Sequence, residues 1–281
     1  MRDVDDEDAA RRGRGPALHR LHPRRLLPRR LWAVAEGDGW GPLPELLLAL
    51  TLVTGLVDAV SILALGRVFV ANMTGNVVFA GFAITGAPGF SLGASLFALG
   101  GFLAGAYLGG RLTARAGQDR ALHLRAAVVG ELTLLTAALI VAAASGGAAV
   151  THGTLHLAAG RATFGVGFID ALAFLLAVAM GIQNSAARAL AVPDLTTTVL
   201  TMTLTGIGHD PRSGHRGHVT LSRRVLAVVT MLAGGVAGAA LVLHVGTLVP
   251  LALSAVLVAL VTGGAAAAAR RPGEWRKAAG R

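Results

Sequence analysis

The chain has 281 residues, of which 54% are hydrophobic and 14% are charged, and its formal net charge is +10. About a quarter of the residues of a soluble domain are charged, so this composition excludes an ordinary soluble protein and indicates a polytopic membrane protein. The positive charge lies at the chain ends and in two loops rather than along an aromatic-lined groove, which argues against nucleic acid as a partner. The absence of cysteine excludes disulfides and cysteine-ligated metals.

Residues 1–41 form a region of their own. An acidic patch is followed by an arginine-rich run from Arg11 to Arg30, which three prolines interrupt. Such a segment cannot bury an apolar core, so we predict a disordered basic tail in the cytoplasm that attracts anionic lipid. Residues 271–281 form a second, shorter basic tail.

Residues 42–270 contain six apolar runs long enough to span a bilayer, since a helix of roughly 20 residues crosses the hydrocarbon core. These runs are residues 43–65, 90–110, 126–145, 164–187, 225–245 and 248–269. Two further stretches, residues 68–86 and 190–208, are rich in polar side chains. Each is predicted to be either a broken, re-entrant helix or a complete polar span.

The distribution of basic residues favours re-entrant helices. Short cytoplasmic loops are enriched in Arg and Lys, and the basic segments here are residues 1–41, 111–125, 212–224 and 270–281. If both polar stretches return to the side from which they start, all four segments lie in the cytoplasm. We therefore predict an all-α protein of the inner membrane, with six transmembrane helices, two re-entrant or broken helices and cytoplasmic termini. Eight full spans are the alternative.

Two acids occur in similar apolar settings. Asp58 lies in Gly-Leu-Val-Asp-Ala and Asp170 in Gly-Phe-Ile-Asp-Ala, and an amide follows each at the same offset, Asn72 and Asn184. Acids inside a membrane span cost roughly 2.5 to 3.5 kcal/mol on insertion scales and are functional candidates by default. We interpret the two acids as matched positions of a duplicated site.

The likeness extends to a glycine motif. Residues 101–106, Gly-Phe-Leu-Ala-Gly-Ala, resemble residues 234–239, Gly-Gly-Val-Ala-Gly-Ala. The first motif precedes a basic loop and the second follows one, which predicts an inverted internal repeat with halves of about residues 42–148 and 149–270. Inverted repeats commonly place a binding site near the bilayer midplane at their interface.

The spacing of these glycines also indicates close helix packing. Gly101, Gly105 and Gly109, like Gly234 and Gly238, follow the small-xxx-small pattern that lets helix backbones approach. The pattern is compatible with packing inside one subunit and with a homo-oligomer.

The candidate site collects carboxylate, amide, hydroxyl and glycine positions from the polar stretches and the acid-bearing spans. These are Asp58, Asn72, Thr74, Gly75, Asn76, Asp170, Gln183, Asn184, Thr196, Thr197, Thr198 and Thr201. Their oxygens could bind a cation or hydrogen-bond a small polar solute, while Gly75 is expected to permit a backbone bend. We therefore predict a transporter or channel. If the side chains satisfy one another instead, they are interhelical contacts worth on average about 0.6 kcal/mol each.

Two other classes of function stay open. A membrane anchor or scaffold would bind its partners through the arginine-rich tail. An intramembrane aspartyl protease would use paired acids, but neither Asp58 nor Asp170 directly follows a glycine, so we expect no enzyme. The histidines of residues 209–218 have no helical metal-binding spacing, and we expect no metal or other cofactor. Glu131 is expected to reach the membrane interface from a span end.

Four segments carry a family resemblance. They are Gly55-Leu-Val-Asp-Ala59, Val68-Phe-Val-Ala-Asn-Met-Thr-Gly-Asn76, Gly181-Ile-Gln-Asn184 and Thr196-Thr-Thr-Val-Leu-Thr201. The chain resembles the YoaK-like family of bacterial inner-membrane proteins over about residues 43–270, and the Asn-Met-Thr-Gly-Asn core is fairly specific to that family. The resemblance implies a multi-pass membrane protein. It supplies no substrate, because the function of the family is unknown.

Overall fold

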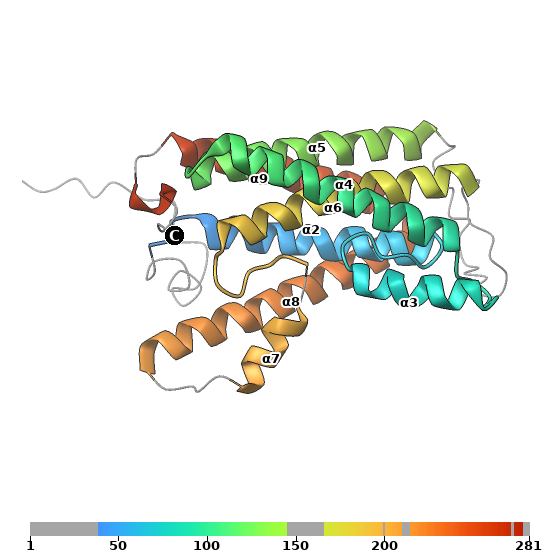
Figure 1. Ribbon diagram of the computed structural model, residues 1–281, viewed down its shortest axis with the longest axis horizontal. Coiled ribbons are helices and arrows are strands. Elements are labelled where there is room, and N and C mark those ends of the chain that lie inside the picture. The colour runs from blue at the N-terminus through green and yellow to red at the C-terminus, as the bar shows by residue number, and fades with distance from the viewer. Residues whose placement is uncertain (1–38, 145–165, 199, 210–213, 271–272, 278–281) are drawn as a thin grey trace, which may run out of the picture.

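The computed structural model describes residues 39–144, 166–198, 200–209, 214–270 and 273–277, and this part of the chain is helical (Figure 1). Most of the predicted N-terminal tail lies outside the described residues. The long helices are α2 (Leu43–Ala64), α4 (Leu92–Ala116), α5 (Arg120–Ala144), α6 (Val166–Leu190), α8 (Gly214–His244) and α9 (Leu248–Ala269). The short ones are α3 (Met73–Ile84), α7 (Thr201–His209) and the 3-10 helix η1 (Glu274–Arg276).

Local sequence explains where several helices begin. Ser91 caps α4 by accepting a hydrogen bond from the Ala94 backbone N–H at 3.2 Å. The Asp119 carboxylate caps α5 by accepting from the backbone N–H groups of Ala121 and Leu122. Pro44 lies in the first turn of α2, where the backbone N–H groups form no hydrogen bond within the helix, so proline is tolerated there. These devices satisfy backbone groups that the membrane interior would leave unpaired.

Glycines set the two closest helix pairs, α2 with α8 and α4 with α6. A Cβ on Gly101 would lie 2.6 Å from the Phe174 carbonyl oxygen, and one on Gly55 would lie 2.5 Å from the Met231 carbonyl oxygen. Further along α4, Gly105 lies against Val178. The predicted packing role of these glycines is confirmed within one subunit.

The close pair α4 and α6 gives a stability prediction. We expect Gly105→Ile to lower the free energy of unfolding by about 2 kcal/mol or more, since its side chain would overlap the Val178 backbone. Gly100→Ile on the same helix is the control, because nothing lies within 4 Å of its Cβ position. Thermal unfolding in detergent measures both variants, and equal losses of stability would contradict the assigned packing.

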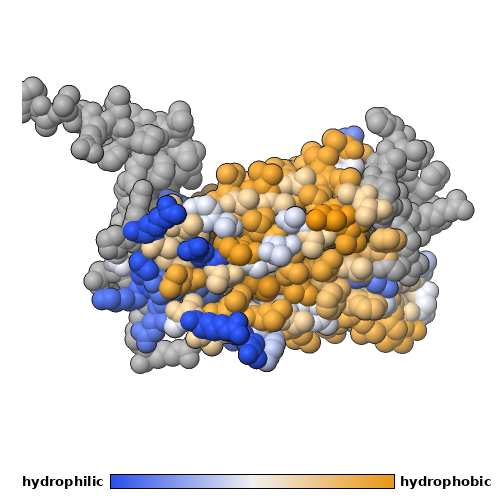
Figure 2. Space-filling model, turned by 90° about the horizontal axis from the view of Figure 1, so that it is seen from above, coloured by the Kyte–Doolittle hydropathy of each residue, from blue (hydrophilic) through white to orange (hydrophobic). Residues whose placement is uncertain are grey.

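Both chain termini of the membrane domain meet at one end of the bundle, which we call the basic end and define as residues 39–42, 117–120 and 273–277. The Arg120 guanidinium stacks over the Trp40 ring at 4.3 Å, and it donates a hydrogen bond to the Trp275 carbonyl oxygen at 3.4 Å. Arg276 forms an ion pair with Asp119. Figure 2 shows hydrophilic residues gathered at one end of the molecule and a mainly hydrophobic surface over the rest.

The charge of Asp119 supports this junction. Burial raises the pKa of its carboxyl group, but hydrogen bonds from Arg276 and from the N–H groups of Leu122 and Ala121 outweigh burial, so the pKa lies below its ordinary value. The carboxylate therefore stays ionised at neutral pH and holds η1 against the start of α5.

The contacts at the basic end and the glycine contacts between helices together fix the direction of every long helix. Helices α2 and α5 begin there, and α4 and α9 end there. Helix α8 runs parallel to α2, because Gly234 lies against Leu52 and Gly238 against Ala59. Helix α6 runs parallel to α4 by the same test, since Gly101 and Gly109 lie against Phe174 and Ser185. The chain thus leaves α2 and starts α4 at the opposite end, whereas it leaves α6 and starts α8 at the basic end.

The connections that contain α3 and α7 therefore return to the end from which they start. Helix α3 has 12 residues and α7 has 9, so they rise only about 18 and 14 Å and cannot span roughly 30 Å of hydrocarbon. Figure 1 shows α3 at the right-hand end of the bundle, whereas α7 lies below α8, left of the middle. Six helices of the described chain are long and apolar enough to cross a membrane. The prediction of six spans and two re-entrant helices is confirmed, and eight full spans are excluded.

Candidate functional site

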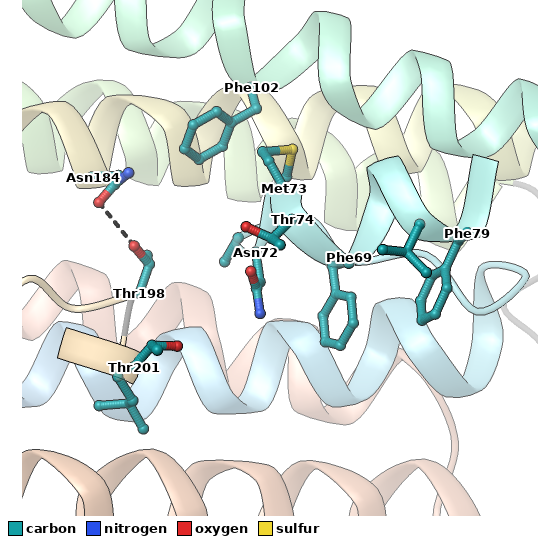
Figure 3. Close-up of a pocket in the computed structure, with 13 residues that line it drawn as sticks. Phe69, Asn72, Met73, Thr74, Phe79, Phe102, Asn184, Thr198 and Thr201 are labelled. Carbon is teal, nitrogen blue, oxygen red and sulfur yellow. Dashed lines mark hydrogen bonds between the residues drawn. The ribbon is translucent and has the colours of Figure 1, made fainter. Parts of the chain in front are cut away.

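A cavity of about 550 Å³ lies where the segment before α3 and the beginning of α7 approach each other (Figure 3). Both chain halves line it. Six of the predicted site residues belong to its wall, namely Asn72, Thr74, Gly75, Asn184, Thr198 and Thr201. The other lining residues are apolar and include Phe69, Phe79 and Phe102. No charged side chain lines the cavity among the described residues, so the wall is a mixture of amide, hydroxyl and aromatic surface.

Asn76 shapes the first re-entrant segment. Its side chain is fully buried and pairs with both backbone groups of Phe69: Oδ1 accepts from the N–H at 2.8 Å, and Nδ2 donates to the carbonyl at 2.5 Å. Asn76 thus replaces a backbone partner and holds the extended segment against the first turn of α3. It is a structural residue and does not line the cavity.

Gly75 has a different role from the one predicted. It lies inside α3 and does not have a positive φ angle, so the expectation of a backbone bend there is wrong. A Cβ at this position would lie 2.5 Å from the Phe69 ring, which indicates that glycine leaves room for the ring. Phe69 in turn stacks on Phe79, with ring centroids 5.7 Å apart. Gly75 therefore allows Phe69 to pack into the aromatic wall of the cavity.

The second re-entrant segment is held by side chains and carries backbone strain. Thr198 donates a hydrogen bond from its hydroxyl to Oδ1 of Asn184 at 2.8 Å (Figure 3). Arg224 of α8 donates to Asp194 at 2.8 Å, and both side chains are largely buried. Ala191, Asp194 and Thr197 have φ angles of 53, 64 and 61°, a region that non-glycine residues seldom adopt. Such strain persists only where surrounding contacts enforce it, and it concentrates at functional sites.

The two acids do not occupy matched places, contrary to the prediction. Asp58 lies near the end of α2, and its side chain is buried with 8% of its surface exposed. Asp170 lies in the second turn of α6, and its carboxylate is 3.5 Å from the Cβ position of Gly93 in the first turn of α4. One oxygen of each carboxylate is buried without a hydrogen-bond partner among the described residues.

Three other predicted residues lie outside the cavity wall. Gln183 is buried between α6 and α2, where it donates to the Thr54 hydroxyl at 2.9 Å. Thr197 is buried and its hydroxyl has no partner among the described groups, whereas Thr196 is exposed. Gln183 thus behaves as an interhelical contact, which is the alternative that the sequence left open for such side chains.

Sequence reasoning missed the aromatic wall and misjudged one acid. The sequence does not distinguish Phe69, Phe79 and Phe102 from ordinary packing residues, because apolar side chains are the norm in apolar segments. Glu131 was expected at a span end, but it lies in the middle of α5 and is fully buried, with both carboxylate oxygens unpaired among the described residues. Within the described chain, no group of three His, Asp or Glu side chains is placed to hold a metal ion.

Comparison with known proteins places the chain in a family. The family described as "Protein of unknown function (DUF1275)" matches residues 46–264. The chain is similar to the UPF0700 transmembrane protein YoaK of Bacillus subtilis (strain 168), with 35% identity over 165 residues, which cover 59% of this chain and 65% of that relative. The match thus spans less than two thirds of the relative's length. No solved structure matches the chain. The chain belongs to the DUF1275 family, and it is a multi-pass membrane protein of that family.

Proposed function

We propose that this protein transports or conducts a small polar solute or ion through the cavity at the beginnings of α3 and α7. The observation that carries the proposal is the meeting of two re-entrant segments at a cavity of about 550 Å³ lined by both halves of the chain. Irregular backbone at membrane depth is tolerated where it lines a cavity, and broken helices at midplane are a recurrent feature of transporters.

An inverted repeat supports the proposal. The contacts between α2 and α8 have counterparts between α4 and α6. The register equates each residue of α2 with the residue of α6 that is 126 positions later, and each residue of α4 with the residue of α8 that is 129 positions later. The equivalent pairs are Gly234 on Leu52 and Gly105 on Val178, Gly238 on Ala59 and Gly109 on Ser185, and Gly55 on Met231 and Gly181 on Phe102. The last residues of α2 and α6, Ala64 and Leu190, are also 126 apart.

This register replaces the one based on the two acids. It equates Gly55-Leu-Val-Asp58 with Gly181-Ile-Gln-Asn184, so the counterpart of Asp58 is Asn184 and the counterpart of Asn72 is Thr198. Each half then contributes three spans and one re-entrant helix. The odd number of spans gives the halves opposite orientations, and their two re-entrant helices start from opposite ends. We further propose that the basic end faces the cytoplasm, because positive loops are retained there.

Cysteine labelling tests the cavity in this cysteine-free chain. We expect Thr74→Cys and Thr201→Cys to react with a membrane-impermeant thiol reagent, because both side chains are exposed in the cavity wall. Thr136→Cys on α5 is the control, since it is exposed on a spanning helix away from the cavity and should face lipid. Gln118→Cys and Val245→Cys, which are exposed in the α4–α5 and α8–α9 turns, should react from opposite sides, with Gln118 cytoplasmic.

Flux measurements in liposomes test transport itself. Parent protein should pass one or more members of a panel of neutral polar solutes and monovalent ions, and a bulky adduct on Thr201→Cys should reduce that flux about tenfold or more. The same reagent should leave the parent unaffected. A reactive cavity without flux across the panel would favour the anchor or scaffold alternative.

A further inference from the structure

The two halves of the chain contribute different chemistry to the cavity. The second half supplies three hydrogen-bonding side chains, Asn184, Thr198 and Thr201. The first half supplies most of the apolar wall, including three phenylalanine rings. Figure 3 shows the three polar side chains on one side of the cavity and the rings of Phe69 and Phe79 on the other. A solute in the cavity therefore meets hydrogen-bonding groups on one side and an apolar, aromatic surface on the other.

The charge of the wall favours an uncharged solute. No charged side chain lines the cavity within the described part of the chain. An ion that gives up its water without a charged partner is disfavoured by about a thousandfold or more. The beginnings of α3 and α7 also lie at the cavity, and a helix N-terminus favours an anion. That preference is only about two- to fivefold at an exposed helix end, so it does not offset the loss of water.

Close packing of α4 on α6 places Phe102 near Asn184. The Phe102 carbonyl lies against Gly181 of α6. Asn184 follows Gly181 by three residues, so the two lie on the same face of α6, about one turn apart. Phe102 and Asn184 both line the cavity, and both residues are partly exposed. One solute can therefore contact the ring and the amide at the same time.

The polar side of the cavity offers both donors and acceptors. Thr198 donates to Oδ1 of Asn184 at 2.8 Å, and the Nδ2 group of Asn184 remains a donor for a solute. Thr201 is exposed in the wall, and its hydroxyl can donate or accept. A cavity of about 550 Å³ has the size of a small-molecule site, and such sites combine a mainly apolar wall with a few polar groups that fix orientation. These groups suit a carbonyl or amide group on a solute.

Building on the proposed transport function, we propose that the cavity binds an uncharged solute with a flat, unsaturated ring and a carboxamide-like polar edge. The ring packs against Phe102, since contact between aromatic rings adds to the gain from apolar burial. The polar edge accepts a hydrogen bond from Asn184 and forms another with Thr201. The class comprises aromatic amides and uncharged heterocycles.

Protection of a cavity cysteine tests this proposal without measuring transport. Thr74→Cys, in the exposed part of the wall, is labelled in detergent by a small hydrophilic thiol reagent while a probe is added. Benzamide is the probe. Benzoate and benzylammonium carry the same ring with a negative and a positive charge, and acetamide carries the amide without the ring. Gln118→Cys, exposed at the basic end, is the control for effects of the probe on the reagent.

We expect benzamide at saturation to slow the labelling of Thr74→Cys about threefold or more, and the other three compounds at the same concentration to leave the rate nearly unchanged. Phe102→Leu should weaken the binding of benzamide about two- to tenfold, because the ring contact is lost while the site stays apolar. Phe97→Leu is the matched control, since it removes an exposed ring of α4 that does not line the cavity. Thermal unfolding in detergent checks that both variants are folded.

Several outcomes would overturn the proposal. Protection by benzoate or benzylammonium that equals protection by benzamide would refute an uncharged solute. Equal protection by acetamide, or a Phe102→Leu variant that binds benzamide as tightly as Phe97→Leu does, would refute the role of the ring. Labelling that benzamide does not slow up to its solubility limit would refute the proposal as a whole.

This proposal and the transport function fail separately. Benzamide that protects Thr74→Cys in protein without flux would refute transport and retain the binding site. Flux of ions without protection by benzamide would retain transport and refute the uncharged class of solute.

Discussion

Asn76→Ala is expected to lower the free energy of unfolding by about 3 kcal/mol, because it leaves both backbone groups of Phe69 unpaired in a buried site. No other backbone partner for these groups exists in the extended segment, since it belongs to neither helix. The loss should concentrate in the first re-entrant segment and raise the reactivity of a cysteine at Thr74. Thermal unfolding in detergent and thiol-labelling rates provide the two measurements.

Asn72→Ala is the matched control for this change. Asn72 lies four residues earlier, is exposed and makes no side-chain capping hydrogen bond to α3. Its removal should alter stability by about 0.5 kcal/mol or less, although it changes the cavity wall. If the two asparagines cost the same on truncation, Asn76 does not organise the segment in the way described.

Arg224→Ala is expected to destabilise the protein by about 3 kcal/mol, since it strands the largely buried Asp194 carboxylate. The guanidinium also packs against Gly206 of α7, so its removal loosens the whole second re-entrant segment. Asp194 has a φ angle of 64°, which makes the segment depend on this contact to keep its conformation. Unfolding in detergent measures the loss.

Two variants separate the ion pair from general effects of charge. Arg111→Ala removes an exposed arginine that contacts Tyr107, and it should cost little. Asp194→Asn combined with Arg224→Gln removes both charges and should recover part of the loss of Arg224→Ala. A double variant as unstable as the single one would show that the pairing is not what Arg224 contributes.

The lengths of the apolar runs and the loop charges predicted the spans well, because the hydrocarbon thickness sets the minimum length of a spanning helix. The re-entrant helices were also predictable. Asn72, Asn76 and Thr198 interrupt the two polar stretches, and the apolar pieces that remain are too short to cross a bilayer. Half of the candidate site gathers at the cavity, but the roles within it could not be read from residue type. Asn76 and Asn72 look alike in sequence, yet one is fully buried against Phe69 and the other is exposed.

The repeat proposed above has a different register from the one that the two acids suggested, and the difference has a physical reason. Gly-Leu-Val-Asp-Ala and Gly-Phe-Ile-Asp-Ala share letters, and short motifs of this kind recur in any chain rich in glycine and apolar residues. Packing imposes a stricter condition, because a glycine must face a partner backbone at close approach. Gly55 and Gly181 meet that condition, and in the proposed repeat they align Asp58 with Asn184 rather than with Asp170. Close approach between helices is a property of pairs of segments, which the single sequence does not display.

The junction of Trp40, Arg120 and η1 joins the start of α2 and the α4–α5 turn to the segment that follows α9. It thereby ties the first half of the chain to the end of the second half at one level of the molecule. Two halves that are joined at one end can separate most at the opposite end. We therefore expect the halves to rotate about the basic end and the bundle to widen near Arg67 and Phe90. Breaking the Asp119–Arg276 ion pair should then allow the halves to move apart at the basic end as well.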